Sequence, residues 1–141
     1  MPIESIVLPE HNLVLTRVTG ELADRELMTY LDQVRADRRL SPGRLGLADV
    51  RDMVVGSSLT LDGIRAVGEL DRQDAGIRRG RLAVVASTEV IFGFARVYAA
   101  HAETAVDSVK VFRTVAEAIR WLGLDVVADE ILTHIPPDAP G

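Results

Sequence analysis

Two patterns of hydrophobic positions take turns along this chain. In one pattern hydrophobic residues run together or alternate with polar ones, which is typical of β-strands. In the other they recur every three or four positions, which is typical of helices that bury one face. The strand-like pattern covers residues 3–8, 13–19, 45–50, 81–86 and 109–112. Turn residues at positions 9–12 separate the first two strands, so we expect an antiparallel hairpin there.

The helical pattern covers residues 24–37, 60–74, 88–103 and 114–123. Asp24 and Thr88 stand where an N-cap is expected. Thr114 and Glu117 form a capping box, in which each side chain satisfies a free backbone N–H group of the other residue. We therefore expect about four helices packed against the sheet.

The order of these elements is strand, strand, helix, and then strand and helix in alternation. This order predicts one α/β domain over residues 1–124, with a mixed sheet of about five strands. Residues 125–141 follow as a C-terminal extension. We expect a short helix there and then a flexible, proline-rich tail, because the prolines after Ile135 cannot continue a helix.

Composition narrows the class of protein. The chain has 141 residues, of which 48% are hydrophobic, and a net charge of -5. The acidic balance argues against a nucleic-acid partner, because phosphate binding needs clustered basic residues. Two arginine groups exist, and both are predicted to be solvated surface: Arg35, Arg38, Arg39 and Arg44, and Arg78, Arg79 and Arg81. The absence of cysteine excludes disulfides, thiol catalysis and cysteine-based zinc sites.

No segment of the sequence resembles a targeting signal or a membrane span. The first residues contain Glu4 and lack a basic start, unlike a secretory signal. The most apolar stretch, residues 82–100, is interrupted by Glu89 and Arg96, so we expect no integral membrane segment. A cytoplasmic location is the resulting expectation.

Four short stretches, in this order and spacing, resemble the STAS domain of anti-sigma-factor antagonists and sulphate-transporter tails, and above all the uncharacterised bacterial proteins called SpoIIAA-like. They are Gly20-Glu21-Leu22, Leu47 to Asp52, Phe92 to Arg96, and Val111-Phe112-Arg113 followed by Glu117-Ala118 and Trp121-Leu122. The resemblance covers residues 3–124 and implies a STAS-like fold.

The resemblance also implies a phosphorylation site. In anti-sigma antagonists, an Asp-Ser pair follows the third strand, and a partner kinase phosphorylates the serine. Here Gly56 replaces the Asp and the register is one residue short, so either Ser57 or Ser58 corresponds to that serine. Both precede a predicted helix N-terminus, which favours a phosphate electrostatically. The alternative is that one of them, or Thr60, is an N-cap.

Asp49, Arg51 and Asp52 cluster at the carboxyl end of a predicted strand, where α/β sheets commonly bind ligands. The alternative is structural: Asp49 accepts hydrogen bonds from loop amides and Arg51 neutralises it. Nothing nearby completes a catalytic set, so we expect no enzyme activity. His11, His101 and His134 share no metal-ligand spacing, so we expect neither a metal site nor a cofactor.

The helix from Val90 to Ala102 is hydrophobic on nearly every side, which requires cover beyond the sheet. A second copy of the chain, giving a homodimer, and the chain's own C-terminal segment are the two candidates. Phe92, Phe94, Arg96 and Tyr98 on this helix are candidate ligand or interaction residues.

These observations favour a non-catalytic regulatory or protein-interaction module with a STAS-like fold. The alternative is a domain that binds a small molecule or lipid in an apolar crevice under the helix from Val90 to Ala102. An exposed apolar patch would support the first function, and an enclosed apolar cavity would support the second.

Overall fold

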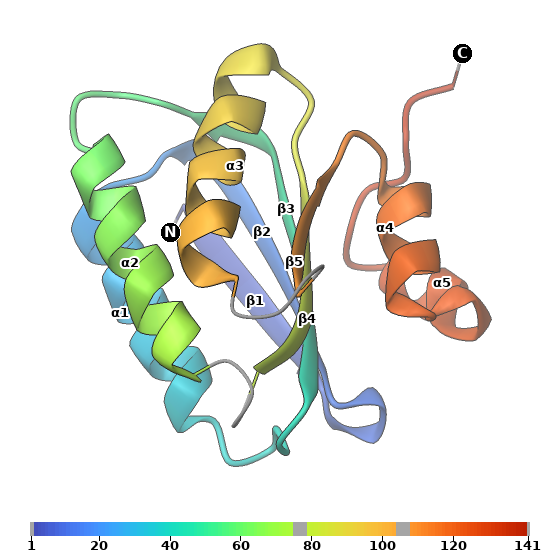
Figure 1. Ribbon diagram of the computed structural model, residues 1–141. Helices are drawn as coiled ribbons and strands as arrows, with labels where there is room; N and C mark the ends of the chain where they lie inside the picture. Colours follow the sequence, from blue (N-terminus) through green and yellow to red (C-terminus); the bar gives the residue numbers. More distant parts are fainter. Residues whose placement is uncertain (1, 75–78, 104–107, 141) are drawn as a thin grey trace.

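The computed structural model describes residues 2–74, 79–103 and 108–140 and contains one mixed sheet (Figure 1). Its strands are β1 (Ile3–Leu8), β2 (Leu13–Glu21), β3 (Arg44–Val54), β4 (Arg79–Val85) and β5 (Val109–Phe112). They lie side by side in chain order. β1 and β2 form the expected antiparallel hairpin, and the pairs from β2 to β5 are all parallel. The predicted five-stranded mixed sheet is therefore confirmed.

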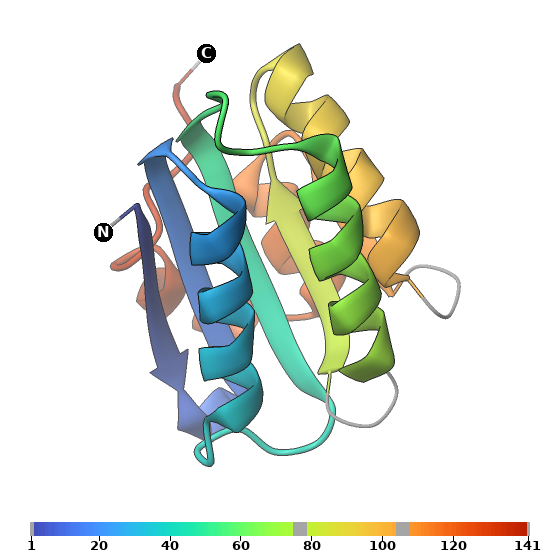
Figure 2. The ribbon, with the colours of Figure 1, turned by 90° about the vertical axis from the view of Figure 1, so that its left-hand side faces the viewer.

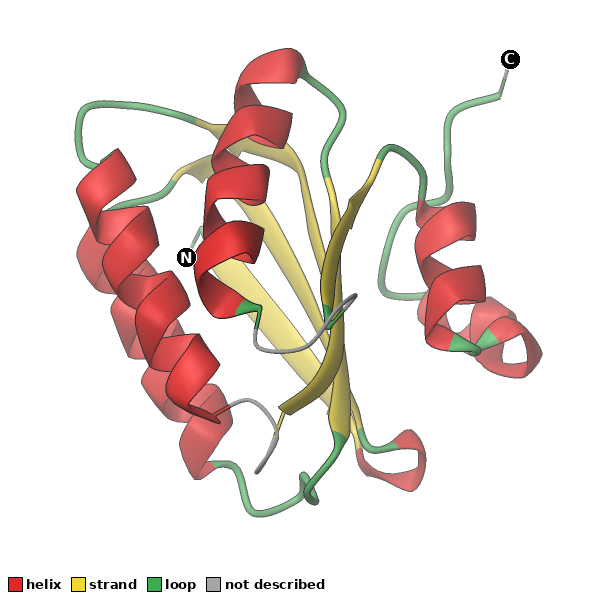
Figure 3. Cartoon of the chain, viewed as in Figure 1, coloured by secondary structure: helices red, strands yellow, loops and turns green. Residues whose placement is uncertain are grey.

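Helices cover both faces of this sheet (Figures 1 and 2). One face carries α1 (Asp24–Ala36), α2 (Leu61–Asp74) and α3 (Glu89–Ala102). Each of these helices joins two adjacent parallel strands, so a constant right-handed crossover places all three on the same face. The other face carries the C-terminal elements α4 (Val115–Leu122), the short 3-10 helix η2 (Asp125–Val127) and α5 (Ala128–Ile131). Figure 3 shows these layers by element type.

β3 lies in the middle of the sheet and is longer than the sequence indicated. Its hydrophobic run ends at Val50, but the strand continues to Val54 because ion pairs satisfy the polar residues between them. Residues 81–86 read from the sequence as the clearest central strand, and they form most of β4, which lies between β3 and β5. The hydrophobic run of β4 thus indicates an interior strand, but the central strand of the sheet is β3.

Alternate side chains of the strands serve two separate layers. Leu15, Leu47 and Val85 belong to a core shared with α4 and α5. Their neighbours Thr16, Ala48 and Val84 face the opposite layer, under α1–α3. Because the interior strands are covered on both faces, the sheet separates two layers of packed side chains.

The C-terminal segment packs against the domain, where the sequence predicted an extension with a frayed tail. α4 ends at Gly123, whose φ of +73° lies in the left-handed region that favours glycine. The chain then turns back, and Ile131 and Ile135 become completely buried in the core beneath α4. The burial of these two isoleucines explains why prolines that follow them do not leave the segment loose.

The long apolar helix α3 is covered by α2 and by the sheet. Gly68 of α2 faces α3 so closely that an added Cβ would lie 2.9 Å from the Cβ of His101 and 3.2 Å from the carbonyl oxygen of Tyr98. The C-terminal segment lies on the other face of the sheet, so the expectation that it covers α3 is wrong. Cover by a second copy of the chain stays a prediction.

Among the helices of the described residues, none is both long enough and apolar enough to cross a bilayer.

Replacement of Ile135 by alanine should destabilise the domain by about 2–5 kcal/mol, because it opens a cavity in a closed core. The matched control is Leu132→Ala, three residues earlier, where the side chain is 36% exposed and the expected cost is about 1 kcal/mol or less. Urea unfolding of both variants measures the difference. Equal losses would contradict the packing of the C-terminal segment.

Candidate functional site

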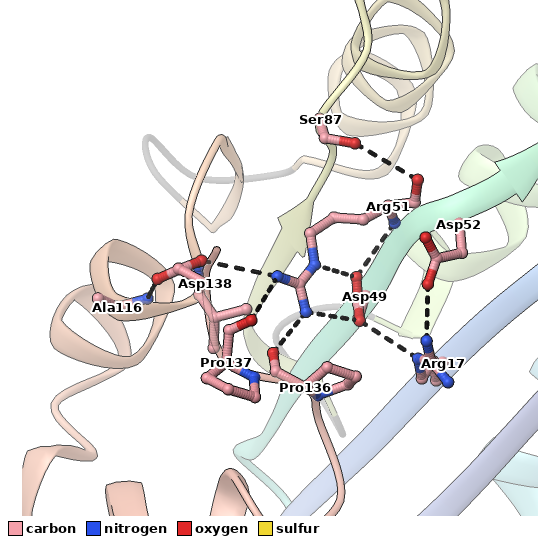
Figure 4. A network of polar contacts seen from close by, with 10 residues as sticks. Arg17, Asp49, Arg51, Asp52, Ser87, Ala116, Pro136, Pro137 and Asp138 are labelled. Atoms are coloured by element: carbon pink, nitrogen blue, oxygen red, sulfur yellow. Dashed lines mark hydrogen bonds and ion pairs between the residues drawn. The ribbon is translucent and has the colours of Figure 1, made fainter. Parts of the chain in front are cut away.

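The Asp49 carboxylate is buried between Arg17 and Arg51 in the middle of β3 (Figure 4), and not at the carboxyl end where the sequence placed it, because the strand continues to Val54. Its Oδ1 accepts hydrogen bonds from the backbone N–H of Arg51 at 3.1 Å and from Arg51 Nε at 2.8 Å. Its Oδ2 accepts a third from Arg51 Nη2 at 3.0 Å. Arg17 completes the group by donating to Asp52 at 2.6 Å. The pKa of Arg51 is raised above its ordinary value, because the hydrogen bonds to Asp49 stabilise the charged guanidinium.

The guanidinium of Arg51 holds the C-terminal segment in place. Its Nη2 donates to the carbonyl oxygen of Pro136 at 2.5 Å, and its Nη1 lies 3.6 Å from the Asp138 carboxylate. Asp138 in turn accepts hydrogen bonds from the backbone N–H groups of Val115 and Ala116 at 2.7 and 3.0 Å, at the start of α4. The chain's own tail thus contacts Arg51 of this cluster. Arg51 neutralises Asp49 as the structural alternative expects, but the backbone amide that donates to Asp49 belongs to β3 and not to a loop.

The two candidate phosphorylation sites lie in the exposed loop between β3 and α2. Ser57 and Ser58 are exposed, and the cap of α2 is formed by Thr60, whose Oγ1 accepts a hydrogen bond from the Gly63 N–H at 2.9 Å. Asp24 accepts hydrogen bonds from the Thr60 N–H and hydroxyl at 3.0 and 2.7 Å. Asp24 is therefore not the N-cap of α1, a position that Ala23 occupies. Modification of either serine stays a prediction.

The four candidate residues on α3 have different surroundings. Phe94 and Tyr98 line a cavity under the helix. Phe92 lies beneath the guanidinium of Arg113, whose central carbon is 4.1 Å from the ring centre. Arg96 is exposed. The structure therefore brings two of the four candidates together at one internal space.

This cavity of about 130 Å³ lies between the sheet and the layer formed by α1–α3. Apolar side chains from all of these elements form most of its wall, among them Val14, Val18, Leu27, Ile64, Val84 and Phe94. The cavity matches the apolar crevice that the sequence analysis placed under the α3 helix, although β2, β3 and α1 contribute more of its wall than expected.

Three residues that carry a hydroxyl group interrupt the apolar wall: Thr16, Tyr30 and Tyr98. Thr16 of β2 and Tyr30 of α1 both line the cavity and are hydrogen-bonded to each other. Burial raises the pKa of Tyr30 to about 12, so its phenol is neutral at physiological pH. In the helical pattern of residues 24–37, Tyr30 is one of the hydrophobic positions, and this spacing gives no sign of a partner on β2.

A buried set of charged residues closes the cavity near the end of α2. Arg44 donates to Asp74 at 2.6 Å, and Arg79 donates to Asp71 at 3.0 Å. The Tyr98 hydroxyl also donates to Asp71, at 2.9 Å. All four charged side chains are almost completely buried, so the expectation that Arg44 and Arg79 lie on a solvated surface is wrong.

The sequence does contain a signal for this network that the analysis missed. Asp71 and Asp74 continue the spacing of Ile64 and Val67 along the buried face of α2. Acidic residues on the buried side of a helix require partners, because burial of an unpaired charge is strongly unfavourable. Burial raises the pKa of Asp71, and Arg79 opposes this by stabilising its charged form.

One group of potential metal ligands lies on the surface. Glu10, His11 and Glu130 place one ligand atom each within 4.8 Å of one another, and His11 Nε2 lies 3.1 Å from Glu130 Oε1. The sequence analysis compared histidines only with one another and so did not foresee this group. Exposed acidic side chains commonly gather without an ion, so we assign no metal to it.

The sheet order and the two helical layers define an α/β domain with a SpoIIAA-like fold. A crystal structure with this fold is similar to the chain: an uncharacterised protein of the DUF3478 family from Shewanella loihica PV-4, with a TM-score of 0.56 and 18% sequence identity. The match covers 85% of this chain and 93% of that protein. At this identity the similarity shows the fold alone, and it confirms the predicted SpoIIAA-like architecture.

No family model matches the sequence, and no curated protein matches it either.

Replacement of Asp49 by asparagine should destabilise the domain by about 2–3 kcal/mol, since it weakens charge-assisted hydrogen bonds at a buried position. The control is Asp52→Asn, whose side chain is 61% exposed in its contact with Arg17 and should contribute less than about 1 kcal/mol. Chemical unfolding measures both. Similar losses in the two variants would contradict the structural role of Asp49.

The raised pKa of Tyr30 makes stability depend on alkaline pH. In the unfolded chain this phenol loses its proton near pH 10, whereas in the folded domain it does so at about pH 12. Between these values the unfolded state binds fewer protons, so the free energy of unfolding falls as the pH rises. Between pH 10 and 12, the free energy of unfolding of Tyr30→Phe should therefore fall by about 2 kcal/mol less than that of the natural chain.

Urea titrations at pH 9, 10, 11 and 12 test this expectation. The interval from pH 7 to 9 serves as the control, because there Tyr30 keeps its proton in both the folded and the unfolded chain. An identical alkaline loss in both proteins would show that Tyr30 is not the group responsible.

Proposed function

We propose that this chain is a non-catalytic binding domain that takes up a small apolar molecule between its sheet and α1–α3. The observation that carries this proposal is the cavity of about 130 Å³ under α3, with its largely apolar wall. Small-molecule sites are typically concave, mostly apolar clefts or cavities with a few polar groups that fix orientation.

The size and chemistry of the cavity favour a compact ligand. An engineered apolar cavity of about 150 Å³ stays dry and binds benzene. Along most of this wall a water molecule would find few polar partners, so an apolar molecule would replace little favourable hydration. A long acyl chain exceeds this space, and we therefore favour a ligand of the size of a single ring.

The polar residues around the cavity support a non-catalytic role. Asp71, the carboxylate that lines it, is engaged by Arg79 and by the Tyr98 hydroxyl. Among the described residues that line the cavity, the hydroxyl that is hydrogen-bonded to a carboxylate is that of Tyr98 on Asp71. Because Asp71 is also held in a buried ion pair with Arg79, we assign this contact a structural role.

A regulatory or protein-interaction module is the second candidate function. It is favoured by the surface at one end of the strands, where β3 ends and α2 and α3 begin; we call this surface the sheet edge (Figure 1). Val54, Leu61 and Val90 are exposed at this edge, with exposed fractions of 52%, 44% and 61%. The exposed Ser57 and Ser58 lie in the same connection between β3 and α2. A protein partner, a second copy of the chain or a kinase would meet this edge, which is separate from the cavity.

A cavity-filling variant tests the first function. Ala95 lines the cavity, whereas Ala100 of the same helix is exposed. We expect benzene to bind the natural chain, Ala95→Leu to weaken its binding at least ten-fold because the added carbon atoms occupy the space, and Ala100→Leu to change it less than two-fold. Methyl-resolved NMR titration with benzene measures the three affinities.

Circular dichroism of the same samples confirms that each variant is folded, because overfilling a core can also destabilise it. Absence of saturable benzene binding to the natural, folded chain would overturn the proposal and favour the second candidate function.

A further inference from the structure

We infer that the ligand of the cavity is a neutral molecule whose ring-sized apolar body carries one hydroxyl or carbonyl oxygen, and that this oxygen binds the Thr16–Tyr30 hydroxyl pair. The inference rests on the proposed function and adds the chemical class of the ligand to it. Thr16 and Tyr30 lie on different elements, β2 and α1, and both line the cavity.

The hydrogen-bonding capacity of the pair is incompletely used. Each hydroxyl group can donate one hydrogen bond and accept two. The hydrogen bond between the two groups uses one of their two O–H donors, so the other O–H has no acceptor within the pair. Among the described residues, the hydrogen-bond partner of each of these two hydroxyls is the other one. A buried donor without an acceptor is unfavourable, so a ligand oxygen that accepts from this O–H would be selected.

The protonation state of Tyr30 agrees with this role. Its pKa of about 12 keeps the phenol neutral, and a neutral phenol donates a hydrogen bond, whereas a phenolate only accepts. The free lone pairs of both oxygens can also accept a hydrogen bond from a ligand hydroxyl. The pair therefore suits an alcohol, a phenol or a small carbonyl compound.

The charged residues of the cavity favour a neutral ligand over an ionic one. Three charged side chains line the cavity: Arg44, Asp71 and Arg79. Arg44 is paired with Asp74, and Asp71 is paired with Arg79. A ligand carboxylate or ammonium would have to lose its hydration without a free counter-ion among these residues, which is strongly unfavourable.

Comparison of phenol with benzene in the natural chain tests the inference. The two molecules have the same ring, and phenol adds one hydroxyl. In a cavity without a free polar partner, the buried hydroxyl would weaken binding relative to benzene. With the Thr16–Tyr30 pair present, we expect phenol to bind at least as tightly as benzene in methyl-resolved NMR titrations.

Variants of the pair locate the effect. Tyr30→Phe should weaken phenol binding about ten-fold and change benzene binding less than two-fold. Thr16→Val, which keeps the shape of the side chain, should act in the same direction. The matched control is Thr29→Val, whose exposed hydroxyl donates to the Arg25 carbonyl oxygen away from the cavity and should leave both affinities unchanged.

The outcomes separate the two proposals. If neither probe binds the natural chain, the proposed function fails. If benzene binds and phenol binds at least ten-fold more weakly, or if both folded variants of the pair keep the natural ratio of the two affinities, the function stands and the inference about the hydroxyl pair is wrong. Should Tyr30→Phe not fold, Thr16→Val and the ratio in the natural chain still decide.

Discussion

The alternation of side chains along the fully covered strand β3 is the constraint on which the rest of the structure depends. A strand with a helical layer on each face must assign every residue to one layer or the other. Ala48 faces the cavity, whereas Asp49 and Arg51 face the C-terminal segment. The sheet therefore keeps the cavity and the ion-pair cluster apart, although their residues are neighbours in sequence.

Two sets of buried ion pairs join β3 to other segments of the domain. In the middle of β3, Asp49 is paired with Arg51, and Arg51 binds the C-terminal segment, which in turn caps α4 through Asp138. At the start of β3, Arg44 joins the strand to the end of α2 through Asp74. Buried pairs of this kind are seldom a net source of stability, but loss of one partner is costly. They therefore fix which segments meet.

The cavity under α3 has the opposite character. Its wall is mostly apolar, its charges are paired, and the hydroxyls of Thr16 and Tyr30 supply a polar contact that carries no net charge. This combination favours recognition of one oxygen on a compact apolar body. The exposed Ser57 and Ser58 are not among the residues that line the cavity, so the two proposed functions involve different parts of the molecule.

The sequence by itself determined the elements and their order, because hydrophobic periodicity, caps and turn residues are local signals, and the SpoIIAA-like fold followed from the resemblance of four short stretches to that family. Of the four candidate residues on α3 that it indicated, Phe94 and Tyr98 line the cavity. Only the tertiary structure decided that the cover of α3 includes α2, which approaches closely at Gly68, and that Ile135 anchors the tail. It alone brought Tyr30 to Thr16 and Arg79 to Asp71. Such contacts join elements that are separated along the chain, and no local pattern of residues encodes which buried polar groups will meet.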